Sequence, residues 1–128
     1  MKRAMAIRPT VGGFPVLAEV LREAGVKLNI WNLPSCESLY LTDQGPVANL
    51  GTPLVAGFAD IPAFDRDALI RALRTKQAGE STFPEFLMAS WNAGVVRYEV
   101  NFEARQVTYF GASSESYVES YPAVSLEK

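Results

Sequence analysis

The sequence predicts a single α+β domain over residues 1–128, in which two α-β-β units form a mostly antiparallel sheet and a helix links them. Three observations support this fold class. The first is an internal similarity between two segments of the chain. The second is a strand–turn–strand pattern in the later segment, which is typical of antiparallel pairing. The third is the composition, because 128 residues with 48% hydrophobic and 20% charged residues suit one globular domain.

The internal similarity relates residues 14–55 to residues 83–124 at an offset of 69 positions. Nine of the 42 aligned positions are identical without a gap, against about two or three expected by chance. One interpretation is the duplication of one α-β-β unit, which gives a pseudo-twofold domain. The other is that two ordinary helix–glycine–strand units share their boundary residues. We favour the duplication.

The first unit begins with a helix predicted from about residue 14 to residue 24, and Gly25 ends this helix. Two strands follow near residues 27–33 and 38–42. A stretch rich in glycine and proline, residues 43–62, then separates the two units. A short strand is expected inside this stretch, near residues 54–58.

A helix predicted over residues 65–78 links the two units. Asp65 has the position of an N-cap, Phe64 and Leu69 have the spacing of a hydrophobic staple, and Gly79 ends the helix. One side of the helix is apolar and the other is basic, which is typical of a helix with one solvated face. The basic residues are Arg66, Arg71, Arg74 and Lys76.

The second unit carries the clearer local signals. Thr82 and Glu85 form a capping-box pattern, and Gly94 ends the helix that this pattern begins. Apolar and polar residues alternate over residues 96–102, which predicts a half-buried strand. A short turn and a partner strand over residues 106–111 complete the unit.

Several runs of the chain resemble those of a known family. The second half carries Thr-Phe-Pro-Glu-Phe (82–86), Ala-Gly-Val-Val-Arg-Tyr (93–98), Asn-Phe-Glu-Ala-Arg-Gln-Val-Thr-Tyr-Phe-Gly (101–111) and Tyr-Val-Glu-Ser-Tyr-Pro (117–122), and the first half carries Leu-Pro-Ser-Cys-Glu-Ser-Leu-Tyr-Leu-Thr-Asp (33–43). Over most of residues 12–124 the chain therefore resembles the YbcV-like family of uncharacterised bacterial proteins, some of which are labelled phage envelope proteins. The resemblance implies a compact bacterial domain, and it implies no particular reaction or catalytic residue.

The composition excludes several classes of function. The chain has no histidine, which removes histidine-based catalytic triads and dyads and histidine metal sites. It has one cysteine, Cys36, so no intramolecular disulfide forms. Its net charge of −2 argues against a general nucleic-acid binder. We therefore expect no metal, no cofactor and no nucleic-acid partner.

The sequence also bears on location. No stretch approaches 18 consecutive apolar residues, so we expect no membrane span. The basic residues at the start lack a following apolar stretch of signal-peptide length. The expected location is therefore cytoplasmic.

Four residues form the predicted ligand-binding site: Trp31, Tyr40, Arg97 and Tyr109. Tyr40 and Tyr109 are equivalent in the repeat, so a pseudo-twofold axis would bring both to one cleft, where aromatic walls suit a flat ligand. Arg97 lies on a predicted strand, which would hold its guanidinium rigidly enough to orient an anionic group. The alternative is that the aromatic residues pack in the core and that Arg97 and Glu99 are neighbours on a solvated sheet face.

The function that the sequence favours is a non-catalytic module that binds a small anionic or aromatic molecule or a partner protein, because no acid–base constellation is present. One alternative is a small histidine-free enzyme that uses Arg, Tyr or Cys side chains. Another is a structural protein that self-associates, for example as a homodimer. Cys36 has two interpretations of its own: a nucleophile or redox group in a loop, or a small half-buried apolar residue.

Overall fold

Six strands of the described chain pair antiparallel in one sheet, and three helices accompany them. The computed structural model describes residues 13–55 and 60–123. The helices are α2 (Gly13–Glu23), α3 (Arg66–Gln77) and α4 (Phe83–Asn92), and the strands are β1 (Val26–Asn32), β2 (Glu37–Thr42), β3 (Gly45–Leu50), β4 (Val95–Asn101), β5 (Gln106–Gly111) and β6 (Ser116–Ser120). The strand order is β3-β2-β1-β4-β5-β6. The expected α+β class with antiparallel pairing is therefore confirmed.

The sheet contains two strands, β3 and β6, that the sequence analysis does not predict, so each half has three strands after its helix instead of two. β3 lies inside the stretch that is expected to be irregular. Its Pro46 is tolerated because β3 is an edge strand, and one side of an edge strand has no partner. The strand expected near residues 54–58 is absent at residues 54 and 55, and residues 56–59 lie outside the described residues.

The helix boundaries follow the capping residues in the sequence. The side chain of Asp65 accepts a hydrogen bond from the backbone N–H of Ala68 and begins α3, which matches the expected linking helix. Thr82 and Glu85 form a reciprocal capping box at the start of α4. Gly94 follows α4 with a φ of 88°, and a Cβ atom there would lie 2.5 Å from the backbone that precedes α3. This position therefore requires glycine.

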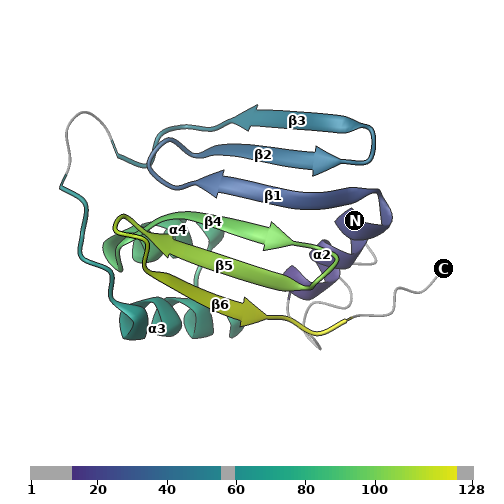
Figure 1. The fold of residues 1–128 in the computed structure, drawn as a ribbon. Helices are drawn as coiled ribbons and strands as arrows, with labels where there is room; N and C mark the ends of the chain where they lie inside the picture. The colour runs from purple at the N-terminus through teal and green to yellow at the C-terminus, as the bar shows by residue number, and fades with distance from the viewer. Residues whose placement is uncertain (1–12, 56–59, 124–128) are drawn as a thin grey trace.

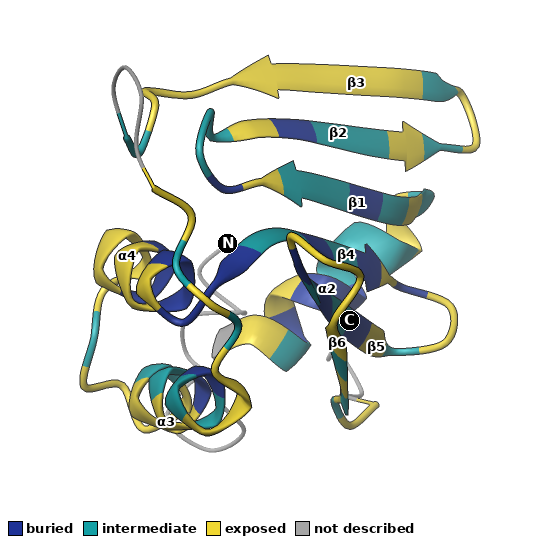
Figure 2. Ribbon diagram, turned by 60° about the vertical axis from the view of Figure 1, so that its left-hand side comes forward, coloured by how far each residue is buried: buried dark blue, intermediate teal, exposed yellow. Residues whose placement is uncertain are grey.

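The helices lie on one face of the sheet, as Figures 1 and 2 show. The largest of the fully buried apolar side chains are those of Val16, Leu33, Leu69, Val95, Val100 and Phe102. The hairpin of β2 and β3 extends past the helices, and β3 is almost entirely exposed (Figure 2). The helical layer thus covers the middle of the sheet and stops short of the β3 edge.

The two halves of the sheet join where β1 pairs with β4. A backbone hydrogen bond extends this pairing at each end: the N–H of Leu33 donates to the carbonyl of Val96 at 3.0 Å, and the N–H of Phe102 donates to that of Lys27 at 3.2 Å. β4 begins 69 residues after β1, and β5 begins 69 residues after β2. The halves therefore form one continuous sheet, with the centre of the molecule at the β1–β4 pair.

Candidate functional site

A row of aromatic side chains crosses the helix-covered face of the sheet. Trp31 in β1 lies opposite Tyr98 in β4, Tyr98 lies opposite Tyr109 in β5, and Tyr109 lies opposite Tyr117 in β6. The ring centroids of the successive pairs are 6.0, 5.8 and 6.4 Å apart. Residues directly opposite each other on one face of a sheet are in contact distance, so the strand register alone brings these rings together.

A second row runs beside the first and is mostly apolar. It consists of Tyr40 in β2, Asn29 in β1, Val100 in β4 and Val107 in β5. Asn29 is buried, and its side-chain amide donates to the backbone carbonyl of Leu39 at 3.2 Å. The two rows together form the floor of a cavity.

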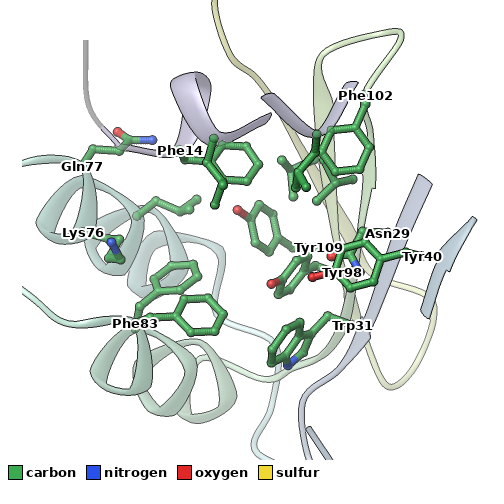
Figure 3. Close-up of a pocket in the computed structure, with 16 residues that line it drawn as sticks. Phe14, Asn29, Trp31, Tyr40, Lys76, Gln77, Phe83, Tyr98, Phe102 and Tyr109 are labelled. Atoms are coloured by element: carbon green, nitrogen blue, oxygen red, sulfur yellow. The ribbon is translucent and has the colours of Figure 1, made fainter. Parts of the chain in front are cut away.

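The helices supply the walls of this cavity, which has a volume of about 450 Å³ (Figure 3). The lining residues from the helices are Phe14, Leu17 and Leu21 in α2, Leu73, Lys76 and Gln77 in α3, and Phe83 and Phe86 in α4. The ring of Phe83 meets the indole of Trp31 edge-on, with centroids 5.3 Å apart. Three of the lining residues, Phe14, Leu17 and Phe83, are about 40% exposed, which places the mouth of the cavity between α2 and α4.

Tyrosine hydroxyls project into the cavity without protein partners. Tyr98 is 8% exposed and Tyr109 is 6% exposed, and no described residue forms a hydrogen bond with either hydroxyl. Figure 3 shows the hydroxyl oxygens of Tyr40, Tyr98 and Tyr109 directed into the same space. Tyr117, outside the cavity, contrasts with them, because its hydroxyl donates to a carboxylate oxygen of Glu119 at 2.8 Å. Buried tyrosine hydroxyls usually find a partner, so the unpartnered pair points to an acceptor other than the described residues.

The protonation state of these tyrosines follows from their burial. Burial raises the pKa of Tyr98 well above its ordinary value of 10.0, with a smaller contribution from the neighbouring Tyr109. Burial also raises the pKa of Tyr109. Both side chains therefore remain neutral at physiological pH and offer an O–H donor to whatever occupies the cavity.

One cation lines the cavity among the described residues. Lys76 in α3 is half-buried, and no described residue forms an ion pair or a hydrogen bond with its ammonium group. Its neighbour Gln77 donates to a carboxylate oxygen of Glu119 at 2.6 Å, and Arg74 pairs with the same oxygen at 2.8 Å. The charge of Lys76 is thus the one that remains available at the cavity wall. From the sequence, Lys76 is expected on the solvated basic face of its helix and not at a cavity.

The structure brings three of the four predicted site residues together. Trp31, Tyr40 and Tyr109 all line the cavity, but Arg97 does not. Successive side chains of a strand point to opposite faces of the sheet. Arg97 is next to Tyr98 in β4, so it lies on the face of the sheet away from the helices. There its Nε atom donates to Glu99 at 3.2 Å, and its guanidinium carbon lies 4.2 Å from the ring centroid of Phe110. The expected clamp on an anion therefore lies outside this cavity, and ligand binding by the four residues stays a prediction.

Several lining residues are missing from the predicted site, notably Tyr98, Phe83, Asn29 and Lys76. Tyr98 carries a signal in the sequence, because it shares the alternation of Val100 and belongs to the apolar face of its strand. Asn29 carries a similar signal, because it shares the alternation of Trp31 in the strand predicted near residues 27–33. The position of Phe83 and Lys76 at the cavity depends instead on how the helices dock against the sheet.

Cys36 lies in the turn between β1 and β2, with a φ of 55°. Its side chain is half-buried and packs against the core, and its Sγ atom donates to the carbonyl of Leu33 at 3.6 Å. These contacts fit the interpretation as a small apolar residue. Over residues 13–55 and 60–123, no three metal-ligating side chains gather at one point. No helix in the same residues has the length and apolar character needed to cross a bilayer.

Comparisons with known proteins identify close relatives. No protein-family model matches the chain. The chain is similar to Uncharacterized protein Rv2012 and Uncharacterized protein MT2067, from two strains of Mycobacterium tuberculosis, and to Uncharacterized protein Mb2035 from Mycobacterium bovis. Each is 55% identical over 121 residues, which cover 94% of this chain and 74% of the relative. The similarity thus extends over nearly the whole chain.

Proposed function

The chain belongs to the family of the mycobacterial proteins Rv2012, MT2067 and Mb2035, and we propose that this domain is a module that binds a small molecule in the cavity between its sheet and its helices. The cavity carries the proposal. Its volume of about 450 Å³ falls within the range of about 300–1,000 Å³ that small-molecule sites occupy. Its lining is mostly aromatic and aliphatic with a few placed polar groups, which is the usual composition of such sites.

The chemistry of the lining favours binding over catalysis. Among the described residues that line the cavity there is no aspartate, glutamate or cysteine. General acid–base catalysis needs a group whose pKa lies near the working pH, and neutral tyrosines with raised pKa values do not provide one. The cavity therefore suits a receptor or carrier better than an enzyme.

The duplication of one ancestral unit is part of the proposal. Strands β1 and β2 correspond to β4 and β5 at the same offset of 69 residues that relates the two sequence segments. The same offset relates the two rows of the cavity floor. Tyr40 and Asn29 in the second row correspond to Tyr109 and Tyr98 in the first row. Two copies of one unit thus account for a cavity floor at the β1–β4 pair. The resemblance to the YbcV-like family stays a prediction beside this proposal.

A titration with 1-anilinonaphthalene-8-sulfonate tests the proposed function. This fluorescent probe has an apolar aromatic body and an anionic group, which match the aromatic lining and the free charge of Lys76. We expect saturable binding of one probe molecule per chain, with enhanced probe emission. Leu17→Trp places a larger side chain at the cavity mouth and should weaken binding at least about tenfold, because it fills space that the probe needs.

The matched control is Leu50→Trp, because Leu50 is 81% exposed in β3 and does not line the cavity. This variant should bind the probe like the unmodified chain. Equal probe affinity in the Leu17→Trp and Leu50→Trp variants, with both folded by circular dichroism, would contradict binding in the cavity.

A further inference from the structure

We infer that the ligand of this cavity carries a carbonyl-type oxygen on an apolar, planar body, and that the hydroxyls of Tyr98 and Tyr109 donate hydrogen bonds to this oxygen. The inference rests on the proposed function and names the class of molecule that the cavity takes. Three features of the cavity support it: the unpartnered donors, the charge of the lining and the shape of the aromatic surfaces.

The cavity contains two hydrogen-bond donors that lack a described partner. The hydroxyls of Tyr98 and Tyr109 belong to side chains that are more than nine-tenths buried, and no described residue accepts from them. Within residues 13–55 and 60–123, the side-chain polar atoms that are fully shielded and lack a partner are the indole nitrogen of Trp31 and the hydroxyls of Ser81 and Ser90. The hydroxyls of Tyr98 and Tyr109 are not among them, because they face the cavity. A ligand oxygen with free lone pairs satisfies both donors at once.

The lining of the cavity is neutral except for one positive charge among the described residues. The tyrosines stay protonated because burial opposes their ionisation, so the cavity presents neutral donors and no anion to a ligand. The one charged group among the described lining residues is the ammonium of Lys76. A cationic ligand would meet this charge with no carboxylate in the lining to balance it. Neutral or acidic ligands are therefore favoured over cations.

The aromatic rings that line the cavity present flat surfaces to a ligand. Trp31 and Tyr98 lie with their ring planes 4° apart, and Phe83 stands at 88° to the indole, so the three rings form a corner with flat sides. Flat apolar groups pack against such a corner by offset stacking and edge-to-face contacts. The hydroxyls of Tyr98 and Tyr109 lie beside this corner, as Figure 3 shows. A planar body next to a carbonyl oxygen fits both features.

The test compares three naphthalene probes of similar size by isothermal titration calorimetry on the unmodified chain. The first is 2-acetylnaphthalene, and the second is 2-isopropenylnaphthalene, in which a methylene group replaces the carbonyl oxygen. The third is the 2-naphthyltrimethylammonium cation. We expect the ketone to bind about tenfold more tightly than the alkene, because two buried hydrogen bonds distinguish them. The cation should bind most weakly.

Variants then assign the difference to the tyrosines. Tyr98→Phe and Tyr109→Phe keep the rings and remove the hydroxyls, so each should weaken ketone binding about threefold and leave alkene binding unchanged. Tyr117→Phe is the matched control, because the Tyr117 hydroxyl bonds to Glu119 outside the cavity. It should change the affinity for neither probe.

The outcomes separate this inference from the proposed function. Equal binding of ketone and alkene, or a ketone preference that is undiminished in both Tyr→Phe variants, contradicts the carbonyl class while the cavity remains a binding site. The tightest binding by the cation contradicts it as well, and indicates an aromatic cage for ammonium groups. Failure of all three probes to bind contradicts both the inference and small-molecule binding by this cavity.

Discussion

The indole of Trp31 lies parallel to the phenol ring of Tyr98, with the ring centroids 6.0 Å apart. Trp31 belongs to the first half of the chain and Tyr98 to the second, and the two residues face each other across the central strand pair. The floor of the candidate site is therefore assembled from both halves at the point where they meet. Neither half contains the cavity by itself.

Loss of the Glu19 carboxylate should destabilise the fold. Glu19 in α2 is 2% exposed, and its two oxygens bind the side chains of Arg22 at 2.9 Å and Arg105 at 2.8 Å. Because removal of one partner from a buried ion pair leaves charge uncompensated, Glu19→Gln should lower the free energy of unfolding by about 2 kcal/mol or more. Urea denaturation followed by circular dichroism measures this. Glu103→Gln, which breaks an exposed pair with Lys27, should cost under about 1 kcal/mol.

The same carboxylate should make stability depend on acid pH. Hydrogen bonding to Arg22 lowers the pKa of Glu19 below its ordinary value of 4.5, and Arg105 adds to this effect. A lowered folded-state pKa contributes stability that is present above the unfolded value and is lost as the pH falls through the folded value. Denaturation midpoints measured from neutral pH downwards should therefore fall less steeply in Glu19→Gln than in the unmodified chain. Parallel profiles for the two proteins would contradict this role.

Alkaline pH should expose the buried tyrosines. Burial raises the pKa of Tyr98 and Tyr109, so an unfolded chain releases their protons near pH 10 while the folded chain retains them. The stability that these two groups contribute is present below pH 10 and is lost as the pH rises above it. Tyrosinate absorbance should increase in two stages, the later one coinciding with loss of the circular dichroism signal. A single early stage that ionises all five tyrosines in the folded protein would contradict their burial.

Replacement of Gly94 should be among the most damaging single changes. Gly94 has a φ of 88° and lies so close to the segment before α3 that an added Cβ atom has no space. We expect Gly94→Ala to cost more than about 2 kcal/mol of stability, measured by thermal unfolding. Gly79 has a similar φ of 76° with open space around it, so Gly79→Ala isolates the conformational part and should cost about 1 kcal/mol.

Replacement of Arg97 should leave the cavity untouched. Arg97 lies on the far face of the sheet and pairs with Glu99, so Arg97→Ala should bind 1-anilinonaphthalene-8-sulfonate as tightly as the unmodified chain. Its stability should fall by less than about 1 kcal/mol, because the pair is partly solvated. Weakened probe binding in this variant would show that the far face contributes to the site.

Local signals in the sequence predict most of the helices and central strands. Asp65 and Thr82 are capping residues in the structure, and the alternation around Tyr98 produces β4. The two strands that the sequence does not predict, β3 and β6, are the edge strands of the sheet. β3 is an exposed edge strand that contains Pro46, and both are features that local rules associate with loops.

The site is predictable only in part. Tyr40 and Tyr109 are predictable because they occupy aligned positions in the two similar segments, and Trp31 because it adds a large aromatic side chain on a predicted strand. Arg97 lies outside the cavity, and the alternation of β4 already indicates this, because it places Arg97 and Tyr98 on opposite faces of the sheet. The role of Lys76 depends on the docking of α3 against the sheet, and that geometry arises from packing between segments distant in sequence.

The contact between Glu19 and Arg105 has a consequence for how the molecule melts. The two residues are 86 positions apart, and they tie the helix of the first half to the turn between β4 and β5 in the second. If either half opened alone, a buried charge would lose one of its counterions, so partial opening carries an electrostatic penalty in addition to lost packing. The halves should therefore lose their structure in one all-or-none step, with equal calorimetric and van't Hoff enthalpies. The domain should in this way behave as a single cooperative body, although its sheet is assembled from two halves of the chain.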